Sequence, residues 1–178
     1  MPELSSIERR AARIKLLLMD CDGVLTDGRL WLLESGDEQK SFNVRDGLGL
    51  DLWHRAGHKS GIISGRNSTA VERRAQILGI QYVRQDSSNK LKDFTELVSM
   101  AKLDESEVAF VGDDLNDIPL MRRSELAIAV ADASEDTKAA AHYVTHAKGG
   151  FGAVRETVEL ILRAQGRWSD VIERYTKG

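Results

Sequence analysis

The feature that most constrains the fold is an apolar run over residues 14–19 that ends abruptly in two carboxylates, Asp20 and Asp22. Asp is a poor strand former, and two buried carboxylates repel each other unless a cation lies between them. A continuous apolar run is typical of a parallel strand buried on both faces, and open α/β sheets bind ligands at the carboxyl ends of such strands. The pair therefore indicates a functional site, although a strand leaving the core through an acidic turn would give the same pattern.

Short apolar runs alternate with amphipathic stretches along the chain, and this order predicts the fold class. We expect strands over residues 59–64, 80–83, 108–111, 126–130 and 143–144, and helices over residues 48–55, 67–78, 89–101, 134–141 and 152–165. The alternation predicts an α/β fold with a doubly wound parallel sheet. Two runs on either side of the Gly36-Asp37 turn predict a β-hairpin insertion, and a polar tail with Trp168 follows the last helix.

The composition is that of a globular domain. The 178 residues suffice for one domain, 1–178, and 42% hydrophobic with 30% charged residues is ordinary for a soluble protein. A net charge of -3 argues against nucleic-acid and membrane partners. Cys21 is the only cysteine, and residues 1–10 lack the apolar core of a secretory signal. We therefore expect a cytoplasmic protein.

Polar residues suited to phosphate chemistry follow three predicted strands and one loop. They are Asp20 and Asp22, then Ser64, Gly65 and Arg66, then Lys90 at a helix start, then Asp113, Asp114 and Asp117 after Gly112. The carboxyl ends of parallel strands share one edge of the sheet, so these groups can meet.

Each group has a chemical reason to be there. A carboxylate can attack a phosphoryl group and form an aspartyl-phosphate, and a second carboxylate can protonate the leaving alcohol and later activate water. Mg²⁺ binds one or two carboxylates together with phosphate oxygens, and Asp113 is the best remaining ligand. Lys90 supplies a point charge, and the Ser64 hydroxyl with the backbone of Gly65 suits other phosphate oxygens.

Taken singly, these residues also have structural explanations. Ser64 could be a turn residue, and Lys90 could be a solvated lysine at the start of a helix. Asp113 and Asp114 could cap the helix that follows, and Asp117 could form a hydrogen bond within its own turn. Their joint occurrence in this order is what indicates phosphoryl transfer.

These motifs resemble the haloacid dehalogenase (HAD) superfamily of phosphatases. The segments 27–28, 42–47, 64–66, 88–90 and 149–156 further resemble the family of 3-deoxy-D-manno-octulosonate 8-phosphate (KDO 8-phosphate) phosphatases. The resemblance implies a Rossmann-like, HAD-type fold without a large cap domain. It also implies that the hairpin, residues 27–46, packs at the centre of a homotetramer in which a neighbouring subunit closes each active site.

The resemblance also implies a role for each site residue. Asp20 would be the nucleophile and a metal ligand, Asp22 the general acid and base with its backbone carbonyl on Mg²⁺, and Asp113 the last protein ligand. Ser64 and Lys90 would hold the phosphoryl group, and Asp117, near Asp114, would orient Lys90 or a metal-bound water. The residues matched to substrate contacts are Asn43, Val44, Arg45, Asp46, Gly47, Arg66 and Arg74, together with Lys90.

The implied function is Mg²⁺-dependent hydrolysis of KDO 8-phosphate for lipopolysaccharide biosynthesis. Two alternatives are a phosphatase for a nine-carbon sugar-acid 9-phosphate and a catalytically silent tetramerisation domain of the same fold. Related nine-carbon enzymes often carry Glu at the position of Arg66, so Arg66 favours the eight-carbon substrate. Asp51 departs from the family, which often has a basic residue there, and weakens that assignment.

Two further segments have alternative explanations. Residues 30–33 are apolar on both faces, so either a partner subunit or the chain's own domain is expected to cover them. Residues 149–152 predict either a flexible loop near the site or the first turn of a helix. The thiol of Cys21 is expected to point away from both neighbouring carboxylates and to have no redox or ligand role.

Overall fold

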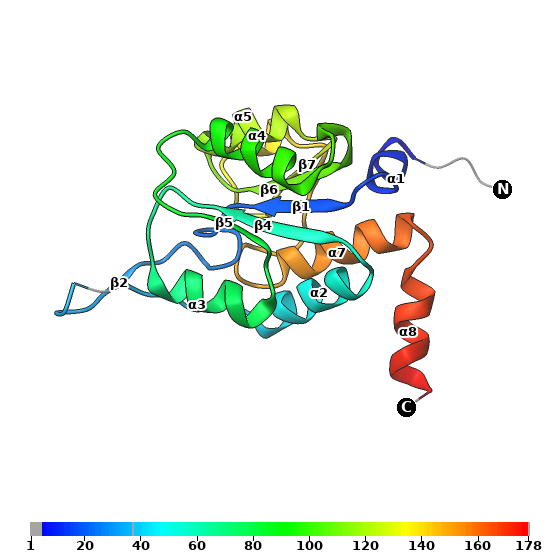
Figure 1. Ribbon diagram of the computed structural model, residues 1–178, viewed down its shortest axis with the longest axis horizontal. Coiled ribbons are helices and arrows are strands. Elements are labelled where there is room, and N and C mark those ends of the chain that lie inside the picture. Colours follow the sequence, from blue (N-terminus) through cyan, green and yellow to red (C-terminus); the bar gives the residue numbers. More distant parts are fainter. Residues whose placement is uncertain (1–4, 37, 178) are drawn as a thin grey trace.

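The computed structural model describes residues 5–36 and 38–177, and its core is a six-stranded sheet (Figure 1). The strand order is β5-β4-β1-β6-β7-β8, and every neighbouring pair is parallel. The strands are β1 (Leu16–Met19), β4 (Lys59–Ile63), β5 (Tyr82–Arg84), β6 (Val108–Gly112), β7 (Leu126–Ala129) and β8 (Tyr143–Val144). The predicted α/β fold with a parallel sheet is confirmed.

The sheet has its switch point beside the central strand. The chain runs from β1 outward to β4 and β5, then returns to β6 on the other side of β1. All four residues of β1 are buried, which explains the continuous apolar run. Because Asp20 follows β1 and Asp113 follows β6, both carboxylates emerge at the switch point, where ligands of such sheets bind.

Helices cover both faces of the sheet. In Figure 1, α4 (Lys90–Ala101) and α5 (Ile118–Arg123) lie on one face, and α2 (Val44–Arg55), α3 (Thr69–Leu78) and α7 (Ala153–Ala164) lie on the other. The remaining helices are α1 (Ser6–Ala11), α6 (Glu135–Ala140), α8 (Trp168–Thr176) and two 3₁₀ turns, Glu105–Glu107 and Leu115–Asp117. Within residues 5–36 and 38–177, no helix combines the length and apolar character that crossing a membrane requires.

The predicted hairpin is present but short. Its strands are β2 (Trp31–Leu32) and β3 (Glu38–Gln39), which pair antiparallel and project from the body (Figure 1). Asp37, in the predicted turn, lies outside the described residues. Between β1 and β4, the described chain forms only this hairpin and α2, in agreement with the expected lack of a large cap domain.

The prediction of a polar tail after residue 165 is wrong, because residues 168–176 form α8. Trp168 is buried, and the guanidinium carbons of Arg155 and Arg163 lie 5.4 and 4.9 Å from its ring centroid. The apolar residues 168, 171, 172 and 175 have the spacing of one helix face, so the signal was present in the sequence. The bounds of the short helix α5, which follows Asp113 and Asp114, were also not predicted.

Candidate active site

The predicted catalytic residues meet in one pocket of about 160 Å³ at the carboxyl ends of β1, β4 and β6. It is lined by Asp20, Asp22, Ser64, Gly65, Arg66, Lys90, Asp113, Asp114 and Asn116. These residues come from four separate segments, so the expectation that the strand ends would bring them together holds for the described chain.

Lys90 lines this pocket and lies between two carboxylates. Its Nζ is 3.0 Å from Asp20 Oδ1 and 2.8 Å from Asp117 Oδ1, and its side chain is only 7% exposed. The solvated helix-start explanation for Lys90 therefore does not apply. Asn89 caps α4 by accepting a hydrogen bond from the Lys92 N–H, which fixes the helix start that carries Lys90.

Asp117 is fully buried and links the two sides of the site. Its Oδ2 accepts a hydrogen bond of 3.0 Å from the backbone N–H of Asp113, while its Oδ1 faces Lys90. Gly112 makes this arrangement possible, because a Cβ added there would lie 2.6 Å from the Cβ of Asp117. The buried position and the ion pair with Lys90 show that Asp117 does more than bond within its own turn.

The carboxylates of the pocket repel one another strongly. Burial, together with the negative charges of Asp20, Asp117 and Asp114, raises the pKa of Asp113 to about 8. Burial and the charge of Asp117 raise the pKa of Asp20 to about 6, although Lys90 opposes the shift. Lys90 therefore does not neutralise the cluster.

The donor set of the cluster fits a divalent cation. Carboxylate oxygens of Asp20, Asp113 and Asp117 lie within 4.8 Å of one another. Hard oxygen donors with excess negative charge are the ligands that Mg²⁺ prefers. Both carboxylate oxygens of Asp117 already accept hydrogen bonds, one from Lys90 and one from the Asp113 N–H, whereas Lys90 contacts only Oδ1 of Asp20. Asp20 and Asp113 are therefore the carboxylates best placed to hold the ion.

Ser64 directly follows β4 and is 2% exposed. Its Oγ accepts a hydrogen bond of 3.2 Å from the backbone N–H of Arg66, while its own N–H donates to the carbonyl of Arg84. The hydroxyl is thus held at the pocket wall by the turn that leads into residues 65–66.

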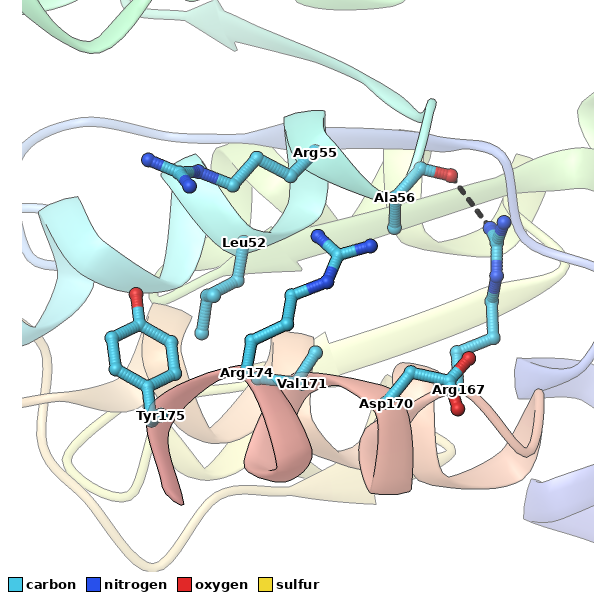
Figure 2. A pocket seen from close by; sticks show the side chains of 8 residues that line it. All are labelled: Leu52, Arg55, Ala56, Arg167, Asp170, Val171, Arg174 and Tyr175. Carbon is cyan, nitrogen blue, oxygen red and sulfur yellow. Dashed lines mark hydrogen bonds between the residues drawn. The ribbon is translucent and has the colours of Figure 1, made fainter. Parts of the chain in front are cut away.

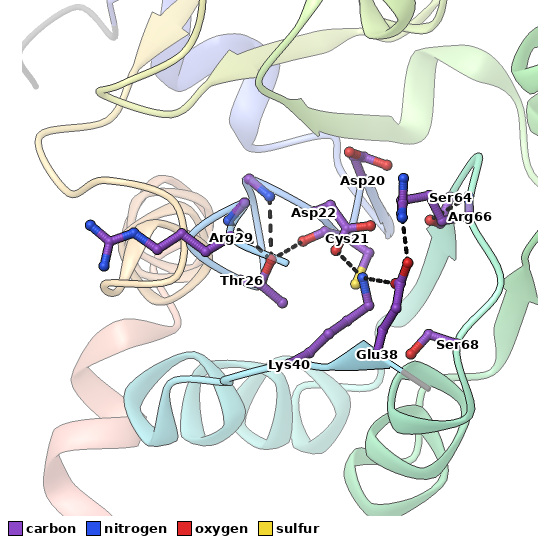
Figure 3. Close-up of polar contacts among 12 residues, drawn as sticks. Asp20, Cys21, Asp22, Thr26, Arg29, Glu38, Lys40, Ser64, Arg66 and Ser68 are labelled. Atoms are coloured by element: carbon purple, nitrogen blue, oxygen red, sulfur yellow. Dashed lines mark hydrogen bonds and ion pairs between the residues drawn. The ribbon is translucent and has the colours of Figure 1, made fainter. Parts of the chain in front are cut away.

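The hairpin contributes two side chains that sequence reasoning missed. Lys40 forms ion pairs with Asp22 and Glu38, and Glu38 also pairs with Arg66 (Figure 3). Lys40 and Glu38 are two residues apart in an extended segment, so their side chains leave on the same side. That alternation was the available signal, but only the folded chain shows that the hairpin turns back toward Asp22.

The predicted substrate segment lies at the start of α2. Asn43 is the N-cap, accepting from the Arg45 N–H at 2.8 Å and donating from Nδ2 to the carbonyl of Gly150. Asp46 is buried and accepts from the backbone N–H groups of Gly152 and Arg155 at 3.2 and 2.8 Å. Val44 and Arg45 are exposed.

Arg74 contacts the same helix start. Its Nη2 donates to the carbonyl of Asn43 at 3.4 Å, and a Cβ added at Gly47 would lie 2.6 Å from that nitrogen. Within the described residues of one chain, neither Arg74 nor residues 43–47 line the pocket. Their contact with substrate stays a prediction.

The departure at Asp51 has a local explanation. Asp51 pairs with Arg55 one turn further along α2, at 2.8 Å, and both side chains are largely exposed. Among the described residues that line the pocket at the strand ends Asp51 is absent, so its negative charge does not face that pocket.

The two remaining predicted features are also placed. Burial raises the pKa of the Cys21 thiol far above its ordinary value, which fits the expectation that it has no redox role. The loop before α7 packs on the loop after Asp22, because Gly150 N–H donates to the Val24 carbonyl at 2.8 Å and Gly149 has no room for a Cβ beside the Gly23 oxygen.

A larger pocket of about 380 Å³ lies elsewhere, between α2 and α8 (Figure 2). It is lined by Leu52, Arg55, Ala56, Arg167, Asp170, Val171, Arg174 and Tyr175. Figure 1 shows α8 at the opposite end of the molecule from the hairpin. This pocket therefore contains none of the carboxylates described above.

The parallel sheet and the carboxylates at its switch point define a hydrolase of the haloacid dehalogenase-like class. The sequence model of haloacid dehalogenase-like hydrolases matches residues 78–155. The chain is 43% identical over 166 residues to 3-deoxy-D-manno-octulosonate 8-phosphate phosphatase of Yersinia pestis, which covers 93% of this chain and 89% of the relative. The chain therefore belongs to the family of 3-deoxy-D-manno-octulosonate 8-phosphate phosphatases.

Two solved structures support this assignment. A probable YrbI family phosphatase of Pseudomonas syringae pv. phaseolica matches with a TM-score of 0.95 and 44% identity, over 97% of this chain and 98% of that one. The KDO 8-phosphate phosphatase of Moraxella catarrhalis, solved with magnesium, phosphate and KDO, matches with a TM-score of 0.94 and 39% identity, over 98% and 100% of the two chains.

Proposed function

We propose that the protein is a Mg²⁺-dependent phosphatase that hydrolyses KDO 8-phosphate to the free sugar acid and phosphate, a step of lipopolysaccharide biosynthesis. The observation that carries the proposal is Lys90 held between Asp20 and Asp117, with Asp113 beside them, at the switch point of the sheet. The family relationship supplies the substrate, since the Moraxella catarrhalis relative was solved with KDO and phosphate.

The chain's own residues divide the chemistry between them. Asp20 attacks phosphorus, so that the Asp20–phosphorus bond forms while the bond from phosphorus to the sugar oxygen breaks. Asp22 gives its proton to that oxygen, then takes a proton from the water that cleaves the aspartyl-phosphate. Lys90 and Ser64 bind the phosphoryl oxygens, and Asp117 holds Lys90 in place.

Asp20 and Asp113, with the backbone carbonyl of Asp22, would hold the metal ion. When bound, Mg²⁺ neutralises charge on the phosphoryl oxygens and offsets the repulsion among the carboxylates. The raised pKa values of Asp113 and Asp20 support this assignment, because such a cluster is costly to ionise without a cation.

We further propose that the hairpin, residues 27–46, joins four copies of the chain into a homotetramer. Trp31, Leu32 and Leu33 are 59%, 74% and 47% exposed, so the domain does not cover them in the described chain. Exposed apolar clusters of this kind mark interaction sites. A neighbouring subunit at the hairpin would also lie close to the pocket, because Lys40 and Glu38 of the same hairpin pair with Asp22 and Arg66, which line it.

A cytoplasmic location belongs to the same proposal. The one cysteine of the sequence, Cys21, is completely buried and can form no internal disulfide, as fits a protein of a reducing compartment.

The test is phosphate release from KDO 8-phosphate and from a nine-carbon sugar-acid 9-phosphate, with Mg²⁺ and with EDTA. Asp20→Asn is expected to abolish release, whereas Asp51→Asn, the same change at an exposed ion pair outside the pocket, is expected to leave it intact. Preference for the nine-carbon substrate would overturn the substrate assignment. No release from either would indicate the silent tetramerisation domain instead.

A further inference from the structure

We propose that Lys40 is a positioning residue that holds the carboxylate of Asp22 in its working orientation, and that Glu38 connects this contact to Arg66 in the pocket wall. Figure 3 shows the Lys40 ammonium directed at Asp22 and Glu38, with Arg66 reaching Glu38 from the loop after β4. The inference rests on the proposed function, because that function makes Asp22 the acid and base.

The burial of Lys40 is the first argument. Its side chain is only 1% exposed, although it belongs to a hairpin that projects from the body. Lysine is almost never buried unless it is paired, since removing an ammonium from water without a partner is very costly. Lys40 has two carboxylate partners: Asp22, and Glu38, whose Oε2 lies 3.3 Å from the Lys40 Nζ. These two partners therefore define where the ammonium lies.

The second argument is the sequence of charges. Asp22, Lys40, Glu38 and Arg66 form a line of alternating sign, and three contacts join neighbouring members. Asp22 and Arg66 both line the phosphate pocket, whereas Glu38 and Lys40 come from the hairpin. The hairpin thus connects two residues that line the pocket, Asp22, which is the proposed acid and base, and Arg66.

The third argument is that Asp22 needs an external restraint. It follows β1 on a short loop, and Gly23 after it has a φ of 92°, a conformation that favours glycine. Proton transfer requires the carboxyl group within hydrogen-bond reach of the sugar oxygen, and a misplacement of about 1 Å can cost about 100-fold in rate. Lys40 contacts Oδ1, which assigns Oδ2 to the transferred proton.

The experiment compares two substrates whose leaving groups differ. The sugar alkoxide of KDO 8-phosphate needs a proton in order to leave, whereas p-nitrophenolate does not. Lys40→Met is expected to lower kcat on KDO 8-phosphate by about 10–100-fold, with KM changed by less than about threefold. The first-turnover release of p-nitrophenolate from p-nitrophenyl phosphate, which reports attack by Asp20, is expected to stay within about threefold of the wild type.

Two further variants separate positioning from structural support. Lys15→Met removes another ion-paired lysine, one that pairs with Glu107 at 2.6 Å and does not line the described phosphate pocket, so it controls for the loss of a charge. Lys40→Arg keeps the cation and is expected to recover most of the lost kcat on KDO 8-phosphate.

The inference is overturned if Lys40→Met keeps kcat on KDO 8-phosphate near the wild-type value. It is equally overturned if Lys40→Met slows the reactions of both substrates by the same factor and also lowers the melting temperature of the protein. That result would make Lys40 a structural residue. Wild-type protein that hydrolyses neither substrate would refute the proposed function itself, so the two failures are distinguishable.

Discussion

Raising the pH is expected to destabilise the metal-free protein, and Asp113→Asn is expected to remove most of that effect. Burial and neighbouring carboxylates raise the pKa of Asp113 to about 8 and that of Asp20 to about 6, whereas Asp in an unfolded chain titrates at about 3.9. The folded state therefore binds more protons than the unfolded chain. This stabilisation is fully present below the unfolded pKa and is lost as the pH rises through the folded values.

The size of the effect follows from the shift at Asp113. Between about pH 6.5 and 8, loss of its proton would lower the free energy of unfolding by about 1.7 kcal/mol, at about 1.4 kcal/mol per unit. Solvent screening at this partly exposed group reduces the figure to about 1 kcal/mol. For a chain of this length the melting temperature should fall by about 2–4 °C.

Circular dichroism melts in EDTA, at several pH values, provide the assay. Burial lowers the pKa values of His54, His58 and His142, so these groups titrate mostly below the chosen window. Asp51→Asn is the matched control and should keep the wild-type slope. Equal pH slopes for the wild type and Asp113→Asn would refute the reasoning.

Added Mg²⁺ gives a second check on the same carboxylates. Metal binding requires their ionised form, so the rise in melting temperature that Mg²⁺ causes should grow with pH in the wild type and largely vanish in Asp113→Asn. A stabilisation by Mg²⁺ that is unaffected by this substitution would place the ion elsewhere.

Three other outcomes are expected. Asp22→Asn should slow turnover by at least about 100-fold. Its Mg²⁺ affinity, measured by calorimetry, should stay nearly unchanged, because only the backbone oxygen of Asp22 is proposed as a ligand. A loss of Mg²⁺ affinity as large as that of Asp113→Asn would contradict this role. Gly112→Ala should cost about 1–3 kcal/mol in urea unfolding, since its Cβ would lie 2.6 Å from that of Asp117; an unchanged midpoint would show that the contact relaxes freely. Leu32→Asp should dissociate the proposed tetramer in analytical ultracentrifugation, and an unchanged sedimentation coefficient would rule out this face as the interface.

The sequence predicted the parallel sheet and most of the helices around it because apolar runs and amphipathic stretches are local features of the chain. The buried run before Asp20 identified β1, and Asn89 marked the start of α4. Element ends were less predictable: α2 begins at Val44 rather than at Leu48, because Asn43 caps it. The helix around Trp168 was missed although its apolar spacing was helical, since charged residues surround it.

The meeting of the proposed catalytic residues in one pocket was predictable for a similar reason. Their residue types, their order and their places after strands are properties of the chain itself, and the carboxyl ends of parallel strands always share one edge. Asp20, Asp22, Ser64, Lys90 and Asp113 line one pocket on that basis. For residues 43–47 and Arg74, the family resemblance predicted contacts with substrate. The described chain shows instead that residues 43–47 form the start of α2 and that Arg74 and the backbone of Arg155 hydrogen-bond to it.

The sequence by itself determined which groups could perform phosphoryl transfer, because the residue types and their positions after successive strands can be identified from the sequence. Only the tertiary structure decided how those groups are charged and held. Lys90 lies between Asp20 and Asp117, and Lys40 reaches Asp22 from the hairpin, through contacts between residues far apart in sequence. Burial and ion pairing act through space, so no pattern along the chain could report the raised pKa of Asp113 or the partner of Asp22.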